Sequence, residues 1–319
     1  MKRALMLGAA GLLLALSAPQ ASAQEAAEVR KNILIICGDE NGTSMMCTSI
    51  DDITVSNRLE VDMGHQVTMM PHNTEAAEML AAANASDLVI IVESVASAAV
   101  STKIVSTPTP ILSSEAFIQD EFGLIAPPLE PVDPGYPGGP SQSQLTAAAA
   151  LLQGVGISLD IEVPPPAAGA PAQTPRQANQ ALNAARNAAI QAALAGMAKP
   201  SHGAIVDQTS LVITNPSHPL AAGLSGRVQV YRVLREMNWG AVANLAPGAE
   251  VVATLPDYPD AAVIYFVPRG GQLANGQPAT GLRIHYFIEN ENGPGTHNLM
   301  TADGFRLFDA AVTYALSGQ

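Results

Sequence analysis

Three short apolar segments near the start of the chain limit the fold that it can adopt. They are 31–37 (KNILIIC), 65–70 (HQVTMM) and 87–92 (DLVIIV). Helix signals fill the two gaps: residues 51–63 begin with acidic residues and are followed by a glycine, and residues 73–83 begin with an Asn cap. Strands that alternate with helices and are apolar on both faces are typical of a parallel sheet covered on both sides. The sequence therefore predicts an α/β domain with a doubly wound, mostly parallel sheet.

The same domain continues in the second half of the chain. A short fourth strand is expected at 109–112, and regular structure resumes at 210–214. Apolar segments predict four further strands and a terminal helix, at 228–233, 250–255, 262–267, 283–288 and 302–316. We therefore expect one domain built from residues 24–123 and 209–319.

Residues 124–208 between the two parts are rich in Pro and Ala, and we expect them to form an insertion. Prolines punctuate the stretch after Phe122 and exclude long regular elements there. Thr174 and Pro175 then provide an N-cap and first position for a helix of about 174–198, with small residues along one face. Two roles fit this helix: close packing on the sheet domain, which we favour, or a cap over a site.

The first 23 residues have the three parts of a signal peptide. Lys2 and Arg3 precede an apolar run from Ala4 to Leu16, and Ala21-Ser22-Ala23 forms a small-x-small cleavage site. The run is shorter than the roughly 20 residues that span a bilayer, and no later segment is long and apolar enough. We expect an exported protein, periplasmic or extracellular, with no membrane span after cleavage.

The overall composition disfavours two classes of partner. The formal net charge is −13. Such a charge repels phosphate backbones, so we expect no nucleic acid partner. Aromatic residues make up 4% of the chain, which argues against a glycan-binding groove built on many stacked rings.

Cys37 and Cys47 are the two cysteines of the chain. Because neighbouring thiols tend to pair in an oxidising compartment, the sequence predicts a disulfide between them. The alternative is two buried free thiols. A zinc site is the least favoured, because the spacing is not CxxC and no second pair exists.

Several segments resemble the trehalose-utilisation-like (ThuA-like) domains. Thr214–Gly226 (TNPSHPLAAGLSG) is similar to their signature, and DLVIIVES at 87–94 fits an early strand of that family. The C-terminal segments GLRIHYFIENENG and LMTADGFRLFDAAVTYAL look like the last strand and helix. The resemblance covers residues 31–123 and 209–318. It implies a class I glutamine amidotransferase-like fold and a connection with carbohydrates.

The chain departs from amidotransferase relatives at the nucleophile. Those proteins place a Cys on a tight turn after a strand, whereas the matching segment here, Pro108–Phe117, has Ser113, Ser114 and Glu115 at the turn and no Cys. We therefore expect glutaminase chemistry to be absent.

The carboxyl ends of the predicted strands indicate where a site would lie. In open parallel sheets, ligands bind at this edge. Asp39, His72, Glu93 and Glu115 follow the first four strands, so we expect them to share a pocket. Converging carboxylates need a cation, a basic ligand or a shared proton. Ca²⁺ or Mg²⁺ would suit the oxygens, and a histidine would allow Zn²⁺. Capping of helices and loops is the alternative role, above all for Asp39.

A serine nucleophile is a second possibility for the same edge. Ser114, Glu115 and His297 are the catalytic candidates, although no G-x-S-x-G motif is present and the sequence cannot place the histidine. We expect a binding or accessory module for a small molecule, such as a carbohydrate. The alternative is a metal-assisted or serine-based hydrolase that uses this edge.

Overall fold

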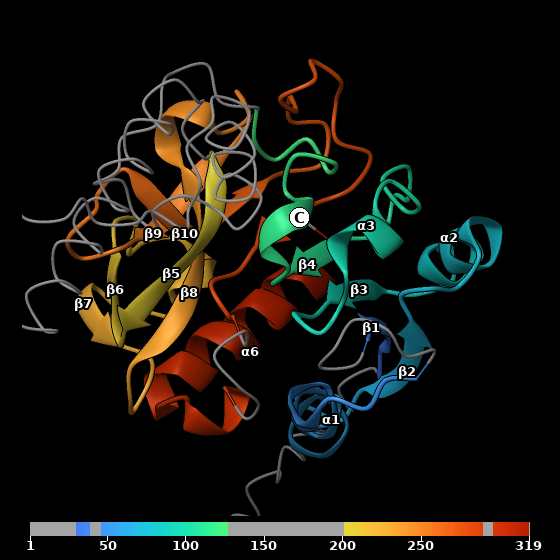
Figure 1. Cartoon of the computed structure of the whole chain (residues 1–319), viewed down its shortest axis with the longest axis horizontal. Coiled ribbons are helices and arrows are strands. Elements are labelled where there is room, and N and C mark those ends of the chain that lie inside the picture. The colour runs from blue at the N-terminus through green and yellow to red at the C-terminus, as the bar shows by residue number, and fades with distance from the viewer. Residues whose placement is uncertain (1–29, 39–45, 127–200, 290–295, 319) are drawn as a thin grey trace, which may run out of the picture.

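The structure is a computed structural model that describes residues 30–38, 46–126, 201–289 and 296–318. One sheet of eleven strands forms its centre (Figure 1). The main path of the sheet has the order β2-β1-β3-β4-β11-β10-β9-β6-β7, and β8 joins β10 to β5 off this path. The strands are β1 (Asn32–Cys37), β2 (Gln66–Pro71), β3 (Leu88–Ile91), β4 (Ile111–Ser113), β5 (His202–Gln208), β6 (Ser210–Ile213), β7 (Gly226–Gln229), β8 (Arg235–Ala241), β9 (Glu250–Thr254), β10 (Ala261–Val267) and β11 (Arg283–His285).

The part of the sheet made by β2, β1, β3, β4 and β11 is parallel. Ile35 is paired with Met69 of β2 and with Ile90 of β3, while Leu112 of β4 is paired with Ile90 and with Ile284 of β11. The carboxyl ends of these five strands therefore lie along one edge, as the sequence predicts.

The other part of the sheet is antiparallel, which corrects the expectation of a mostly parallel sheet. Strands β10, β9, β6 and β7 pair antiparallel along the main path, and β8 pairs antiparallel with both β10 and β5. The connections explain the difference. Only residues 255–260 separate β9 from β10, which is too short for a crossover helix and suits a hairpin.

Helices cover the parallel strands on both faces. The helices are α1 (Ile50–Asn57), α2 (Ala76–Asn84), α3 (Ser97–Val100) and α6 (Ala302–Leu316), with short turns η1 (Arg58–Asp62), η2 (Ala116–Ile118), η3 (Pro219–Ala221), η4 (Val242–Asn244) and η5 (His297–Leu299). Ile33 and Ile35 belong to one core cluster with residues of α1 and α6, while Leu34 and Ile36 belong to a second cluster with residues of α2 and α3. Alternate residues of a strand face opposite sides, so a strand buried on both sides must be apolar throughout.

Helix α6 runs along one face of the sheet (Figure 1). It begins at the cap Thr301, whose hydroxyl accepts a hydrogen bond from the Gly304 backbone at 3.1 Å. Its inward face is formed by Leu307, Phe308, Ala311, Val312 and Ala315, all buried. Gly304 allows the helix to approach the sheet closely, because a Cβ there would lie 2.6 Å from the carbonyl oxygen of Val230.

Some elements differ from the sequence predictions. The helix expected at 51–63 ends as an α-helix at Asn57 and continues as a π-helical turn, and α2 is capped at Glu75 rather than at Asn73. Regular structure resumes at His202, because β5 lies within the last residues of the predicted insertion. The predicted helix 174–198 and the predicted signal peptide fall outside the described residues. Within the described segments, no helix has the length and apolar character needed to cross a membrane.

Candidate functional site

Three glutamates meet at the carboxyl edge of the parallel strands. Glu93 follows β3, Glu115 follows β4 and Glu289 lies beyond β11. Glu115 and Glu289 are buried, with 5% and 1% of their surface exposed, and Glu93 is partly exposed. The charges of Glu289 and Glu115 both act on Glu93, so the three carboxyl groups are neighbours. The sequence predicts Glu93 and Glu115 at this edge, and the charge of Glu115 acts on Glu93.

Asn238 on β8 connects the three glutamates. Its side-chain nitrogen lies within hydrogen-bond distance of the Glu93 Oε1 atom and of the Ser114 carbonyl, and it donates to the Ile288 carbonyl at 2.7 Å. Ser114 and Ile288 immediately precede Glu115 and Glu289. One fully buried amide therefore fixes the Glu93 side chain and the backbone that carries the other two carboxyl groups.

The carboxyl group of Glu93 holds its proton more strongly than an ordinary glutamate. Burial raises the pKa of Glu93 well above its usual value, the charges of Glu289 and Glu115 raise it further, and so does a hydrogen bond to Glu289. The hydrogen bond from Asn238 opposes the rise. A glutamate whose pKa is raised in this way beside acidic neighbours is costly to bury, and such arrangements are common at functional sites.

A second pair of polar residues lies close to this cluster. Asp51, in the first turn of α1, accepts hydrogen bonds through its Oδ1 atom from the His297 backbone at 2.8 Å and from the His297 Nδ1 atom at 3.2 Å. Both side chains are buried. When Nδ1 donates the bond to Asp51, the neutral ring has its acceptor at Nε2. The histidine that the sequence could not place is thus oriented by a carboxylate.

Charged residues of both groups act on Tyr231. The residue is fully buried, and burial raises the pKa of its hydroxyl well above the usual value, followed by the charges of Glu289, Glu93 and Asp51. The backbone of Glu289 partly offsets the rise. Glu93 and Asp51 therefore both lie within electrostatic range of the Tyr231 hydroxyl.

Asp52 and Ser94 form a further buried contact at this edge. The Ser94 hydroxyl donates to Asp52 Oδ2 at 2.6 Å and accepts from the Gly38 backbone at 2.9 Å. Burial raises the pKa of Asp52 to about 7; the bond from Ser94 lowers it in part, and the charge of Asp51 adds to the rise. A Cβ at Gly38 would collide with the Ser94 carbonyl, so this contact requires a glycine.

His72 lies at the same edge and is fully buried. Its Nδ1 atom accepts a hydrogen bond from the Ala96 backbone at 2.9 Å, and its carbonyl accepts one from the Lys103 ammonium at 3.1 Å. The ring packs against Gly38. These contacts suit a residue that shapes the loops after β1 and β3. Asp39, the fourth predicted member of the site, falls outside the described residues.

The metal-assisted and serine-based hydrolase types stay predictions, because Asp39 is outside the described residues. Over the described ranges, no group of three or more His, Cys, Asp or Glu residues is arranged to hold a metal ion. Ser114 contributes its carbonyl to Asn238, and the Ser94 hydroxyl donates to Asp52. Within those ranges, neither serine hydroxyl forms a hydrogen bond with a histidine.

The predicted disulfide is present. Cys37 at the end of β1 is bonded to Cys47 ahead of α1, with the two Cα atoms 5.3 Å apart. It connects the first strand of the carboxyl edge to the chain that leads into the helix carrying Asp51 and Asp52.

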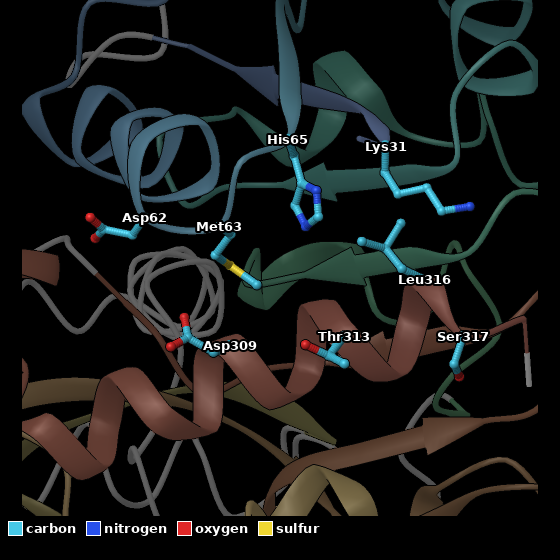
Figure 2. A pocket seen from close by; sticks show the side chains of 8 residues that line it. All are labelled: Lys31, Asp62, Met63, His65, Asp309, Thr313, Leu316 and Ser317. Carbon is cyan, nitrogen blue, oxygen red and sulfur yellow. The ribbon is translucent and has the colours of Figure 1, made fainter. Parts of the chain in front are cut away.

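The cavities of the described residues include two that lie away from this edge. One cavity, of about 470 Å³, lies at the opposite, amino edge, where Lys31 and His65 precede β1 and β2. Figure 2 shows the side chains that line it. Asp309 in its wall is paired with Arg58 at 2.6 Å, and Lys31 is paired with Asp87 at 3.6 Å. A mostly apolar cavity of about 580 Å³ lies between His218 and α6, with Ala310 and Tyr314 in its lining. The carboxyl edge has the more unusual electrostatics, and we take it as the candidate site.

Comparisons with known proteins give a likeness to solved structures. No family model matches the sequence, and no curated protein matches it. Among solved structures, the chain is similar to a protein from Bacteroides uniformis ATCC 8492 that is provisionally assigned as ThuA-like. The TM-score is 0.38 and the identity 9%, over 88% of this chain and 92% of that one.

Sequence reasoning missed Asn238, Asp51 and Tyr231. Asn238 lies in the segment REMNWGA, whose polar residues do not indicate a buried strand. In the structure this strand is buried along nearly its whole length. Asp51 was expected only as an acidic residue near the start of a helix. The signal that was available is the pair Asp51-Asp52 at that start, since two adjacent acids in an N-terminal turn exceed what capping requires.

Proposed function

We propose that the carboxyl edge binds a small polar ligand and that the chain works as an exported binding or accessory module, with carbohydrates as the favoured ligand class. The observation that carries the proposal is the cluster of Glu93, Glu115 and Glu289 fixed by Asn238. Hydroxyl groups both donate and accept hydrogen bonds. A protonated carboxyl group beside other carboxyl groups offers both functions at one place.

The surroundings of the cluster are consistent with such a role. The Cys37–Cys47 disulfide suits an oxidising compartment. The chain has few aromatic side chains, so recognition would depend on hydrogen bonds more than on ring stacking. A ligand that displaces ordered water from these carboxyl groups must replace its hydrogen bonds, and this requirement gives specificity for hydroxyl patterns.

Calorimetric titration with a panel of mono- and oligosaccharides tests the proposal. We expect binding that is lost in Glu93→Gln, which keeps the shape of the side chain but cannot share a proton with Glu289. Glu121→Gln is the matched control. Burial also raises the pKa of Glu121, to about 7, and a side-chain hydrogen bond with Asp120 adds to the rise. Equal affinity in the wild type and Glu93→Gln would place binding elsewhere.

A hydrolase is the second candidate function, and the Asp51–His297 pair is the observation that favours it. In its metal-assisted form, a divalent cation would use Asp39, His72, Glu93 and Glu115. Titration of chelator-treated protein with Ca²⁺, Mg²⁺ and Zn²⁺ tests that form, and heat that disappears in Glu93→Gln supports it. In its serine form, Ser114 would be the nucleophile, and retained turnover in Ser114→Ala would exclude it.

A further inference from the structure

We propose that the cavity between η3 and the last turns of α6 binds a small uncharged phenol, whose ring packs on the cavity wall and whose hydroxyl bonds to His218 and Tyr314. The cavity has a volume of about 580 Å³, within the range of roughly 300–1,000 Å³ that is usual for small-molecule sites. It lies away from the carboxyl edge and shares no residue with that site. The inference therefore goes beyond the proposed function and does not depend on it.

A cluster of three aromatic rings forms one wall of the cavity. The His218 ring stacks on Phe266 of β10 with 4.6 Å between the centroids, and it meets Tyr314 of α6 edge-on at 4.9 Å. Phe266 and Tyr314 also contact each other edge-on, at 5.6 Å. Phe266 is buried, whereas His218 and Tyr314 are partly exposed and line the cavity. Because each ring contacts the other two, the wall is preformed, which lowers the entropic cost of binding.

Two polar groups on this wall can bond to a ligand. The Nδ1 atom of His218 accepts a hydrogen bond from the Leu220 backbone at 3.2 Å, so the neutral ring carries its proton at Nε2. Burial lowers the pKa of His218, against the charge of Glu250, and this favours the neutral ring. Across the residues that the structure describes, neither the Nε2 atom of His218 nor the hydroxyl of Tyr314 has a hydrogen-bond partner. The wall thus offers one donor and one hydroxyl that can donate or accept.

The charges around the cavity disfavour ions. Glu250 at the start of β9 is the register partner of Phe266, and its charge acts on both His218 and Tyr314. An anion would be repelled by this carboxylate. A cation would lose its hydration without a carboxylate in direct contact, which is costly in a mostly apolar cavity. In the part of the chain that the structure describes, the lining contains no acidic or basic residue other than the histidine and consists of His218, Pro219, Ala310, Thr313, Tyr314 and Ser317.

A phenol satisfies each of these features. Its ring suits the apolar lining, and its hydroxyl can accept a hydrogen bond from the Nε2 atom of His218 while it donates one to the Tyr314 oxygen. A sugar would bury more hydroxyl groups than these two side chains can pair, and each unpaired group would cost free energy. A hydrocarbon would leave both side chains unpaired. The single hydroxyl is therefore expected to provide the selectivity.

Titration of the full-length protein with 4-methylphenol, toluene, benzoate and glucose, followed by NMR, tests the proposal. We expect 4-methylphenol to bind and to shift the ring signals of His218 and Tyr314. Toluene, which lacks the hydroxyl, should bind about 10-fold more weakly. Benzoate and glucose should leave these ring signals unchanged. Absence of 4-methylphenol binding, equal affinity for toluene, or shifts of these signals by benzoate or glucose would overturn the proposal.

Tyr314→Phe tests the hydroxyl without removing the ring. Its affinity for 4-methylphenol should fall by about 10-fold, while its affinity for toluene should be unchanged. Tyr258→Phe is the matched control, because Tyr258 lies between β9 and β10 and is not part of the lining. Retained affinity for 4-methylphenol in Tyr314→Phe would overturn the assigned hydrogen bond.

Two further variants test the cavity itself. Ala310→Leu places a larger side chain in the cavity and keeps a good helix former in α6, so binding should be lost in a folded protein. His218→Asn keeps an acceptor for the Leu220 backbone but removes the ring, and it should weaken binding by about 10-fold or more.

His65→Asn is the matched control for the histidine, because His65 lines the separate cavity of Figure 2. It should leave the affinity for 4-methylphenol unchanged. Binding that survives in Ala310→Leu but is lost in His65→Asn would place the phenol in that other cavity and overturn the proposal. These variants change no residue of the carboxyl edge, so a negative result here leaves the proposed function untouched.

Discussion

Asn238 donates a hydrogen bond from its side-chain nitrogen to the backbone carbonyl of Ile288 over 2.7 Å. This bond joins β8 of the antiparallel part to the chain that leaves β11 in the parallel part. The same nitrogen faces Glu93 and the Ser114 carbonyl, so the candidate site depends on a contact between the two parts of the sheet.

Removal of this amide should destabilise the protein. We expect Asn238→Ala to lower the free energy of unfolding by about 1–3 kcal/mol, because Glu93 and two buried carbonyl groups lose a donor. Urea unfolding measures the change. Asn298→Ala is the control: Asn298 donates to Thr54 in an exposed contact at 3.3 Å, and its loss should cost much less. Equal costs for the two variants would contradict a central role for Asn238.

The disulfide should stabilise the native protein measurably. A double Cys37→Ser and Cys47→Ser variant should lose about 2–3 kcal/mol on the loop-entropy model, since the two cysteines are separated by 10 positions. Thermal unfolding with and without reductant should show the same difference in the wild type and none in the variant. Alkylation of both thiols in unreduced protein would show that the bond does not form.

Asp52 should make the protein less stable as the pH rises from about 4 to about 7. Its folded pKa is raised from 3.8 to about 7, so the folded state binds more protons than the unfolded state between these values. The stabilising contribution is therefore full below pH 4 and is lost as the pH rises through 7. Asp52→Asn removes this titration, and its stability curve should be flatter over the same range. A wild-type curve as flat as that of the variant would contradict the raised pKa.

Arg58 should stabilise the fold through the geometry of its guanidinium group as well as through its charge. Its guanidinium donates two hydrogen bonds to Asp309, at 2.7 Å and 2.6 Å, and lies 4.3 Å from the centroid of the Phe305 ring. Lysine keeps the charge but cannot make the paired contact, so Arg58→Lys should cost about 1–2 kcal/mol. Arg306→Lys is the control, because Arg306 pairs with Asp303 at 3.3 Å in an exposed contact. A cost no larger than that of the control would show that solvent screens the Arg58 pair as well.

Much of the fold could be predicted because it follows from residue patterns within short segments of the sequence. In segments such as 87–92 and 302–316, the apolar residues have the spacing expected of a buried strand and of a helix with one buried face. The structure has β3 and α6 there. The strand ends also indicated Glu93 and Glu115. Crossover helices between the early strands imply that these strands run parallel. The edge at which both residues lie could therefore be predicted from the sequence.

The remaining features depend on contacts between distant segments. Strand β8 contains Glu236, Asn238 and Gly240, which no hydrophobic pattern would assign to a buried strand; the Asn238 amide has a partner in a distant segment, the Ile288 carbonyl. The Asp51–His297 pair joins residues that are 246 positions apart. The direction of the late strands was also hidden, since an apolar strand has the same appearance in parallel and antiparallel pairing.

Strand β11 pairs with β4 through Arg283 and Ile111, and this pairing has a consequence for the order of assembly. Glu93 and Glu115 are synthesised early, but Asn238, Glu289 and His297 come from the last third of the chain. During synthesis, Glu93 and Glu115 are therefore present before the other residues of the candidate site, which are complete only when the final strand and helix have been made. A truncation before β11 would remove no residue from the first four parallel strands, yet it would abolish the candidate site completely.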